Sequence, residues 1–274
     1  MSNTKEKHFV NINNHKICYY SNEVNELNLE EQTTVLVIHG AMGNAVTTSD
    51  FSETLASLGS NKRVFQLDLP GHGNSNGDAV SSISELADIV IQFISHMQEK
   101  HIFTDKVVLV GHSMGGSICI QTCLNGFKPT ALVLISSAPE WSSLSVMKDV
   151  TSDIIGNAFK GMMEQDFSIN TTIEERDRLV SQIDDMAATP EASLSDIKAL
   201  LSFDVKNEIS TITSPVLIVY GDNDFTATID NQNFMLNHFN NSTAYFIEGG
   251  THTTVIKNAE EVANAVNSFI EQEH

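Results

Sequence analysis

The chain has 274 residues, 41% of them hydrophobic and 18% charged, and this composition excludes a disordered or collagen-like protein. Its 15 Lys and Arg residues against 35 Asp and Glu give a formal net charge of −20, which repels phosphate backbones, so we expect no nucleic-acid partner. No stretch reaches the roughly 18 apolar residues of a membrane span, and the N-terminus is polar, so we expect a cytoplasmic protein without a membrane span.

The first predicted element is a β-hairpin. Residues 8–12 and 16–20 flank Asn13-Asn14, a pair that tolerates the left-handed conformation of a tight turn. Six short apolar runs follow, separated by stretches long enough for helices, which is typical of parallel strands buried on both faces. These predicted strands are Val35–Ile38, Val64–Leu67, Val107–Val110, Ala131–Ile135, Val216–Tyr220 and Ala244–Ile247.

Apolar residues at three- and four-residue spacing predict helices between these strands. The predicted helices are Phe51–Leu58, Ile83–Gln98, Gly115–Leu124, Asn231–His238 and Ala259–Ile270. Residues 137–214 break the alternation, because they show helical patterns without a convincing strand. We interpret them as a helical cap insertion, which leaves residues 1–136 and 215–274 as the core of one α/β fold.

The three cysteines of the chain are too few and too poorly spaced for a disulfide framework or a zinc site. We interpret Cys18, Cys119 and Cys123 as small core residues and expect no metal site.

Two segments of the chain match the pattern G-x-S-x-G, and their surroundings separate them. Gly111–Gly115 follows an apolar strand directly and opens a helix that begins with small residues, as a nucleophile turn requires. Gly73–Gly77 has neither neighbour, so we interpret Ser75 as part of a solvated turn. Ser113 is therefore the predicted nucleophile.

A sharp strand-to-helix turn exposes the serine hydroxyl and points the helix N-terminus at the same place. The backbone N–H of Met114 is then available to a developing oxyanion. A second donor is expected from the turn His39–Gly43, which follows a predicted strand and can aim the N–H of Ala41 at the same point. The alternative is that this segment is a plain tight turn.

A serine hydroxyl needs a histidine to accept its proton and an acid to orient that histidine. His252 follows the last predicted strand and so lies at the same carboxyl edge as Ser113. His39 and His72 also lie in loops near that edge, and we interpret them as turn or supporting residues. Asp224 has more reach toward a neighbouring loop than Asp222, which could cap the turn instead, so Asp224 is favoured as the acid while Asp222 stays open.

The order nucleophile, acid, histidine, each after a separate strand, resembles the α/β-hydrolase superfamily over essentially the whole chain. The resemblance is carried by His39-Gly40, Asp68–Ser75, Gly111–Gly115, Gly221–Asp224 and His252. It implies a serine esterase or lipase with an eight-stranded, mostly parallel sheet, flanking helices and a helical cap after the sixth strand. It also implies Asp224 as the acid and a structural role for the Asp68 loop, and the serine at the elbow makes dehalogenase or epoxide hydrolase chemistry unexpected.

This arrangement implies an acyl-enzyme mechanism that requires no metal or cofactor. The presumed cap offers apolar side chains for an acyl pocket, although ordinary packing is the alternative for them: Trp141, Phe159, Met162, Met163 and Phe167. Arg176 and Arg178 read as a solvated helical face, so no clamp for a carboxylate is evident and the expected partner is a small or medium uncharged ester. A thioesterase, a perhydrolase, a carbon–carbon hydrolase and a ligand-binding signalling protein on the same scaffold remain alternatives.

Overall fold

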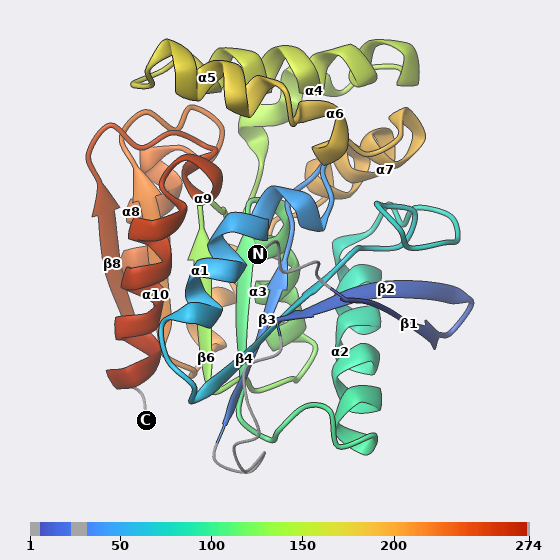
Figure 1. Ribbon diagram of the computed structural model, residues 1–274, viewed down its shortest axis with the longest axis vertical. Helices are drawn as coiled ribbons and strands as arrows, with labels where there is room; N and C mark the ends of the chain where they lie inside the picture. Colours follow the sequence, from blue (N-terminus) through green and yellow to red (C-terminus); the bar gives the residue numbers. More distant parts are fainter. Residues whose placement is uncertain (1–5, 23–31, 273–274) are drawn as a thin grey trace.

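The computed structural model describes residues 6–22 and 32–272, which form one eight-stranded sheet with helices around it (Figure 1). The strands lie in the order β1-β2-β4-β3-β5-β6-β7-β8. Their bounds are β1 Glu6–Ile12, β2 His15–Asn22, β3 Thr33–Ile38, β4 Lys62–Leu67, β5 Val107–His112, β6 Ala131–Ile135, β7 Val216–Gly221 and β8 Ser242–Ile247. The polar N-terminal residues 1–5, on which the expected location rested in part, lie outside the described residues.

The predicted hairpin is confirmed. β1 pairs antiparallel with β2, with Ile12 opposite His15, and Asn13 in the turn has a φ of +52°. β2 also pairs antiparallel with β4, and every other pairing in the sheet is parallel. The six predicted parallel strands are therefore all present.

One detail of the strand prediction is wrong. β8 is not buried on both faces, because it is the edge strand of the sheet and has a neighbour on one side only. Ala244 is exposed and Phe246 is 48% exposed. An edge strand that few side chains cover can have the same apolar sequence as a central strand and still be exposed.

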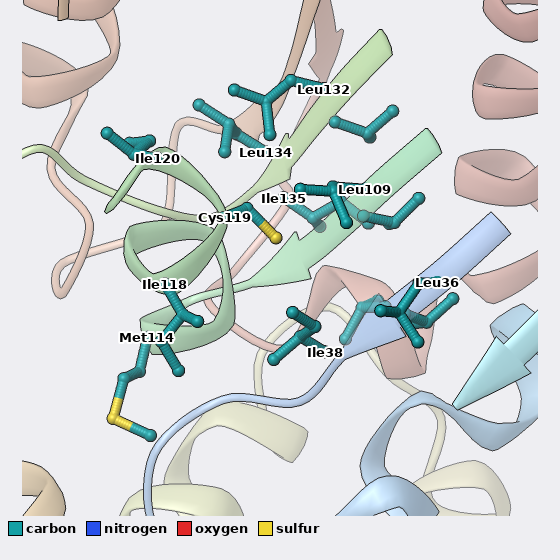
Figure 2. Close-up of a cluster of buried hydrophobic side chains, with 14 of the residues drawn as sticks. Leu36, Ile38, Leu109, Met114, Ile118, Cys119, Ile120, Leu132, Leu134 and Ile135 are labelled. Atoms are coloured by element: carbon teal, nitrogen blue, oxygen red, sulfur yellow. The ribbon is translucent and has the colours of Figure 1, made fainter. Parts of the chain in front are cut away.

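The helices flank the sheet, with α1 packed against α10 and α2 packed against α3 (Figure 1). Their bounds are α1 Ser49–Ser57, α2 Ile83–Glu99, α3 Met114–Leu124, α4 Ser152–Phe167, α5 Ile173–Val180, α6 Ile183–Met186, α7 Pro190–Leu201, α8 Ile229–His238, α9 Thr254–Lys257 and α10 Ala259–Gln272. α3 is apolar on nearly all sides, which is typical of a helix that is buried completely. Figure 2 shows its side chains against those of β3, β5 and β6, with Cys119 directed at the strands.

Helices also fill the chain between β6 and β7. α4, α5, α6 and α7 lie beyond the carboxyl ends of the strands, with α4 packed against α7 (Figure 1). Short 3-10 helices, η3 (Ser142–Met147) and η4 (Ile209–Thr211), flank them. We call residues 142–211 the inserted segment. Among the described residues, no helix is long and apolar enough to cross a membrane.

Two interpretations of single residues need correction. Ser75 does not lie in a solvated turn, because it is buried and its Oγ accepts from Cys18 N (2.7 Å) and donates to Asp68 O (2.7 Å). It therefore ties the loop after β4 to β2. Of the cysteines, Cys18 and Cys119 are buried as expected, whereas Cys123 is partly exposed at the edge of the core.

Candidate active site

Ser113 lies on a strained turn between β5 and α3. Its backbone has φ +52° and ψ −121°, a region that costs a residue with a side chain about 1–3 kcal/mol. The turn is possible because glycines stand on both sides of it: a Cβ at Gly111 would lie 2.3 Å from the Gly115 carbonyl, and one at Gly115 would lie 2.2 Å from the Ile38 oxygen. β5, α3 and β3 therefore pack closely around Ser113.

Hydrogen bonds from the end of β6 hold this turn in place. The N–H of Ser113 donates to the carbonyl of Ile135 (2.9 Å), and its own carbonyl accepts from Ser137 Oγ (2.8 Å). A strained conformation persists only where its surroundings over-determine it, and these bonds supply that restraint. The hydroxyl of Ser113 is thereby presented at the carboxyl edge of the sheet.

The structure brings Ser113, His252 and Asp224 into one line of hydrogen bonds. Ser113 Oγ donates to His252 Nε2 (2.9 Å), and His252 Nδ1 donates to both oxygens of Asp224 (3.0 Å each). Because a carboxylate only accepts, the Nδ1 proton is required, and this leaves Nε2 free to accept from the serine. The imidazole is therefore held in the tautomer that can remove a proton from Ser113.

Asp224 is itself anchored, which separates it from Asp222. Its Oδ1 accepts from the backbone N–H groups of Thr226 and Ala227 (2.9 Å each). Burial alone would raise the pKa of Asp224, but the facing His252 and these hydrogen bonds lower it below its ordinary value. Asp222 is exposed and accepts from Gly249 N (2.7 Å), so it caps the turn.

The surroundings of His252 stabilise the imidazolium that forms when its ring accepts a proton. Burial lowers its pKa, but the negative charges of Asp224 and then Asp166, with the Asp224 hydrogen bond, raise it above the ordinary 6.5 overall. His112 also holds the loop of His252, because its Nε2 donates to the His252 carbonyl (2.9 Å). Burial and the neighbouring His252 lower the pKa of His112 to about 3, so it stays neutral.

The turn after β3 lies against the nucleophile. A Cβ on Gly40 would lie 3.1 Å from Ser113 Cβ, so only glycine allows this approach without displacement. His39 Nε2 accepts from Leu69 N (3.1 Å), so its Nδ1 carries the proton and donates to the Gly40 carbonyl (2.8 Å). Among the described residues, neither the Ala41 nor the Met114 N–H donates to a protein acceptor.

A cavity of about 650 Å³, its open mouth included, adjoins Ser113, His252 and Ala41. Of the predicted pocket residues, Trp141, Phe159, Met162 and Met163 line it, whereas Phe167 is fully buried in the core and is absent from its walls. The sequence did not indicate the other apolar residues that the inserted segment contributes: Leu144, Ile197 and Leu200. None of the described residues that line this first cavity is Asp, Glu, Lys or Arg.

A second cavity of about 580 Å³ adjoins the first, and His252 lines both of them. Met162, Met163, Thr226 and Thr253 line both cavities, and the second is more polar because Gln165, Asp166 and Asn223 contribute to it. No group of three or more His, Cys, Asp or Glu side chains that could hold a metal ion occurs in residues 6–22 and 32–272.

Comparison with known proteins assigns the family. A family model described as "Serine aminopeptidase, S33" matches residues 30–258. The chain belongs to the serine aminopeptidase S33 family. The S33 chain is 21% identical over 267 residues to the proline iminopeptidase PfmaB of Pestalotiopsis fici, covering 89% of this chain and 93% of that one. It is 24% identical over 205 residues to a pimeloyl-[acyl-carrier protein] methyl ester esterase of Vibrio campbellii, covering 68% and 74%.

Solved structures show that the S33 chain has the α/β-hydrolase fold. An esterase from Exiguobacterium antarcticum superposes with a TM-score of 0.81 at 18% identity, covering 96% of this chain and 98% of that one. The enol-lactonase from Burkholderia xenovorans superposes with a TM-score of 0.80 at 16% identity, covering 96% and 100%. At such identities the likeness concerns the fold alone.

The sequence reasoning missed a polar cluster that supports the His252 loop of the S33 chain. Asp166 of α4 accepts from Thr251 Oγ1 (2.6 Å) and from Thr253 Oγ1, so it holds the residues on both sides of His252. Lys257 Nζ donates to the Asp166 carbonyl (3.1 Å) and so joins the same helix end to α9. These contacts join segments more than 80 residues apart in the chain, so no local pattern could indicate them.

Proposed function

We propose that the chain hydrolyses uncharged carboxylic esters with a small to medium acyl group, through an acyl-enzyme on Ser113. The observation that carries this proposal is the hydrogen-bonded line from Ser113 through His252 to Asp224, opening into an apolar cavity. An imidazole nitrogen that can accept a proton, 2.9 Å from the hydroxyl of a serine on a strained turn, is the arrangement that makes serine nucleophilic at neutral pH.

In the first step, Ser113 Oγ bonds to the acyl carbon while its proton passes to His252 Nε2. The carbonyl oxygen becomes an oxyanion, for which the N–H groups of Ala41 and Met114 are the donors in this proposal. The bond to the leaving oxygen then breaks, and the His252 proton goes to that oxygen, which releases the alcohol. Water, deprotonated by His252, then bonds to the acyl carbon; the bond from that carbon to Ser113 Oγ breaks, His252 returns its proton to Oγ, and the acid is released.

The first cavity supports an apolar acyl group. Ala41 and Ser113 line this cavity, so the oxyanion and the acyl carbon belong beside these two residues. Its walls carry no Asp, Glu, Lys or Arg among the described residues, and a charged acyl chain placed there would lose its hydration without gaining a partner. An uncharged chain gains from the burial instead.

The leaving alcohol belongs on the side of the second cavity. His252 must reach the leaving oxygen to protonate it, and His252 borders both cavities. The second cavity also carries polar side chains that the first lacks, and Phe225 in its wall is 78% exposed. This arrangement supports residues 137–214 as a cap over the site, because side chains of this segment line both cavities.

An aminopeptidase activity, which the family description and one relative would suggest, finds less support. Its substrates carry a protonated α-amino group, which needs a carboxylate partner once it is buried. Asp166 is the one carboxylate among the described residues that line the two cavities. Its Oδ1 already accepts from Thr251 and Thr253, and Lys257 Nζ lies 4.0 Å from it.

The test is a panel of nitrophenyl esters of increasing acyl length, with matching thioesters and an aminoacyl nitroanilide. We expect turnover of the uncharged esters and stoichiometric labelling by a fluorophosphonate, with the adduct on Ser113 by peptide mass spectrometry. Ser113→Ala should lower kcat by at least about 10⁴-fold and abolish labelling. Ser75→Ala, at the other G-x-S-x-G segment, is the matched control and should keep both. Labelling without ester turnover, or turnover that survives Ser113→Ala, would refute the proposal.

A further inference from the structure

Asp196 of α7 is a buried carboxylate outside the proposed proton line. It has no exposed surface, and its Oδ2 accepts from the N–H of Met42 (2.7 Å) and from His72 Nε2 (3.0 Å). Its Oδ1 is buried without a hydrogen-bond partner in the described part of the chain. Burying a carboxylate is costly, so its partners indicate what it does there.

His72 balances the charge of Asp196. Its Nδ1 lies 2.9 Å from the carbonyl of Pro70, which only accepts, and its Nε2 faces the carboxylate. Both ring nitrogens therefore carry protons, and the ring is an imidazolium. Burial lowers the pKa of His72, but the charge and hydrogen bond of Asp196 raise it above its ordinary value overall. Asp196 thus remains a full acceptor for the Met42 N–H.

The peptide groups before and after Ala41 are each held by a different side chain. The Gly40 carbonyl accepts from His39 Nδ1 (2.8 Å), and because a trans peptide points its N–H away from its carbonyl, this bond sets the direction of the Ala41 N–H. The next peptide group is set by Asp196 through the Met42 N–H. Met42 has a φ of +60°, a conformation that a residue with a side chain keeps only when it is restrained.

We propose that Asp196 is a positioning residue that holds the Ala41 N–H in the direction an oxyanion requires. This inference rests on the proposed function of Ser113. It makes the oxyanion hole depend on how α7 is seated, because Asp196 belongs to the inserted segment and Met42 to the core. Two further hydrogen bonds join the same parts: the backbone N–H of Ala188 donates to the Met42 carbonyl (2.9 Å), and the side-chain Nδ2 of Asn44 donates to the Asp185 carbonyl (2.9 Å).

The expected effect falls on kcat. Loss of one oxyanion donor costs about 10²- to 10³-fold, and a displaced donor costs less than a missing one. Asp196→Asn keeps the size and one acceptor oxygen but loses the charge, so we expect kcat to fall about 10- to 100-fold. Asp196 does not line either cavity, so KM should stay within about threefold.

The experiment compares wild type, Asp196→Asn and the control Asp184→Asn in steady-state ester hydrolysis and in the rate of fluorophosphonate labelling. Asp184 is an exposed carboxylate of the same inserted segment, paired with Lys160 at 3.5 Å, and its variant should behave as wild type. If Asp196→Asn does not fold, His72→Gln takes its place, because it removes the balancing cation and should lower kcat about tenfold.

A fall in kcat at nearly constant KM, in a variant with a native circular dichroism spectrum, supports the positioning role. A folded Asp196→Asn or His72→Gln variant with kcat within about twofold of wild type overturns it, and so does a loss carried by KM alone. Labelling separates this inference from the proposed function, because the phosphoryl oxygen enters the same hole. If wild type is labelled but hydrolyses no ester, the proposed function fails and the ratio of labelling rates decides the role of Asp196. If wild type is not labelled, both fail.

Discussion

Replacing Asp224 by asparagine changes one atom of the site and should reverse the tautomer of His252. The Asp224 Oδ1 accepts from two backbone N–H groups, of Thr226 and Ala227 at 2.9 Å each, and an amide NH₂ cannot take over that role. The asparagine oxygen must therefore stay with the backbone, and its NH₂ then faces His252 Nδ1. Nδ1 becomes an acceptor, and the ring proton moves to Nε2.

The magnitude follows from what Nε2 can then do. With a proton on Nε2, His252 cannot accept from Ser113 Oγ, which lies 2.9 Å away. A serine triad held in the wrong tautomer loses about 10⁴-fold in kcat, which corresponds to about 5.5 kcal/mol of transition-state stabilisation. The variant also loses the charge that raises the pKa of His252, so the acid limb of its pH profile should move to lower pH.

The assay is kcat/KM for a nitrophenyl butyrate between pH 5 and pH 9. In wild type, activity needs neutral His252 and should therefore rise with pH. The midpoint of this rise should lie above pH 6.5, since the pKa of His252 is raised above that value. Asp222→Asn is the matched control and should stay within about threefold of wild type, because Asp222 is an exposed turn cap. An Asp224→Asn variant that keeps more than a tenth of wild-type activity, or an Asp222→Asn variant that loses it, would refute this reasoning.

Three further changes test how the structure supports the site. Ser75→Ala leaves the Cys18 N–H buried without its acceptor and should lower the free energy of unfolding by about 1–3 kcal/mol in urea titrations, with turnover per folded molecule unchanged. His39 and His112 have pKa values lowered to about 3, whereas the unfolded chain takes up protons near pH 6.5, so unfolding free energy should fall on acidification from pH 6.5 toward 5. The fall should be up to about 1.4 kcal/mol per pH unit for each histidine, and a flat profile would contradict their neutral burial. Gly115→Ala would place a Cβ 2.2 Å from a β3 carbonyl oxygen, so we expect no folded, labelled protein, and a native melting curve would contradict the elbow geometry.

Local patterns predicted the scaffold well for a physical reason. A buried parallel strand shows as a short apolar run, and a helix shows as a period of three to four, so both are visible within about ten residues. The bounds of the predicted hairpin and of α3 differ from those observed by two residues at most. β8 was misjudged because an apolar run does not tell whether its strand lies at an edge.

The residues of the site could be predicted where they directly follow the ends of strands. Parallel strands bring their carboxyl ends to one edge, so a serine, an aspartate and a histidine that each follow such a strand come near one another. The structure places Ser113, Asp224 and His252 within hydrogen-bond distance, and their catalytic roles stay predictions for the variants above to test. The sequence favoured Asp224 over Asp222 by its reach, and only the structure shows that Asp224 faces His252 Nδ1 whereas Asp222 accepts from Gly249 N.

The pattern along the chain determined the α/β class, the strand sequence and the glycine-flanked turn at Ser113, because these depend on alternation and steric limits among neighbouring residues. Tertiary structure alone decided that Ser75 is buried, that Phe167 lies in the core and not in the cavity wall, and that Asp196 accepts from an N–H 154 residues away in the chain. Such contacts depend on how the inserted segment packs over the sheet, and packing is a property of surfaces that no short stretch of sequence contains.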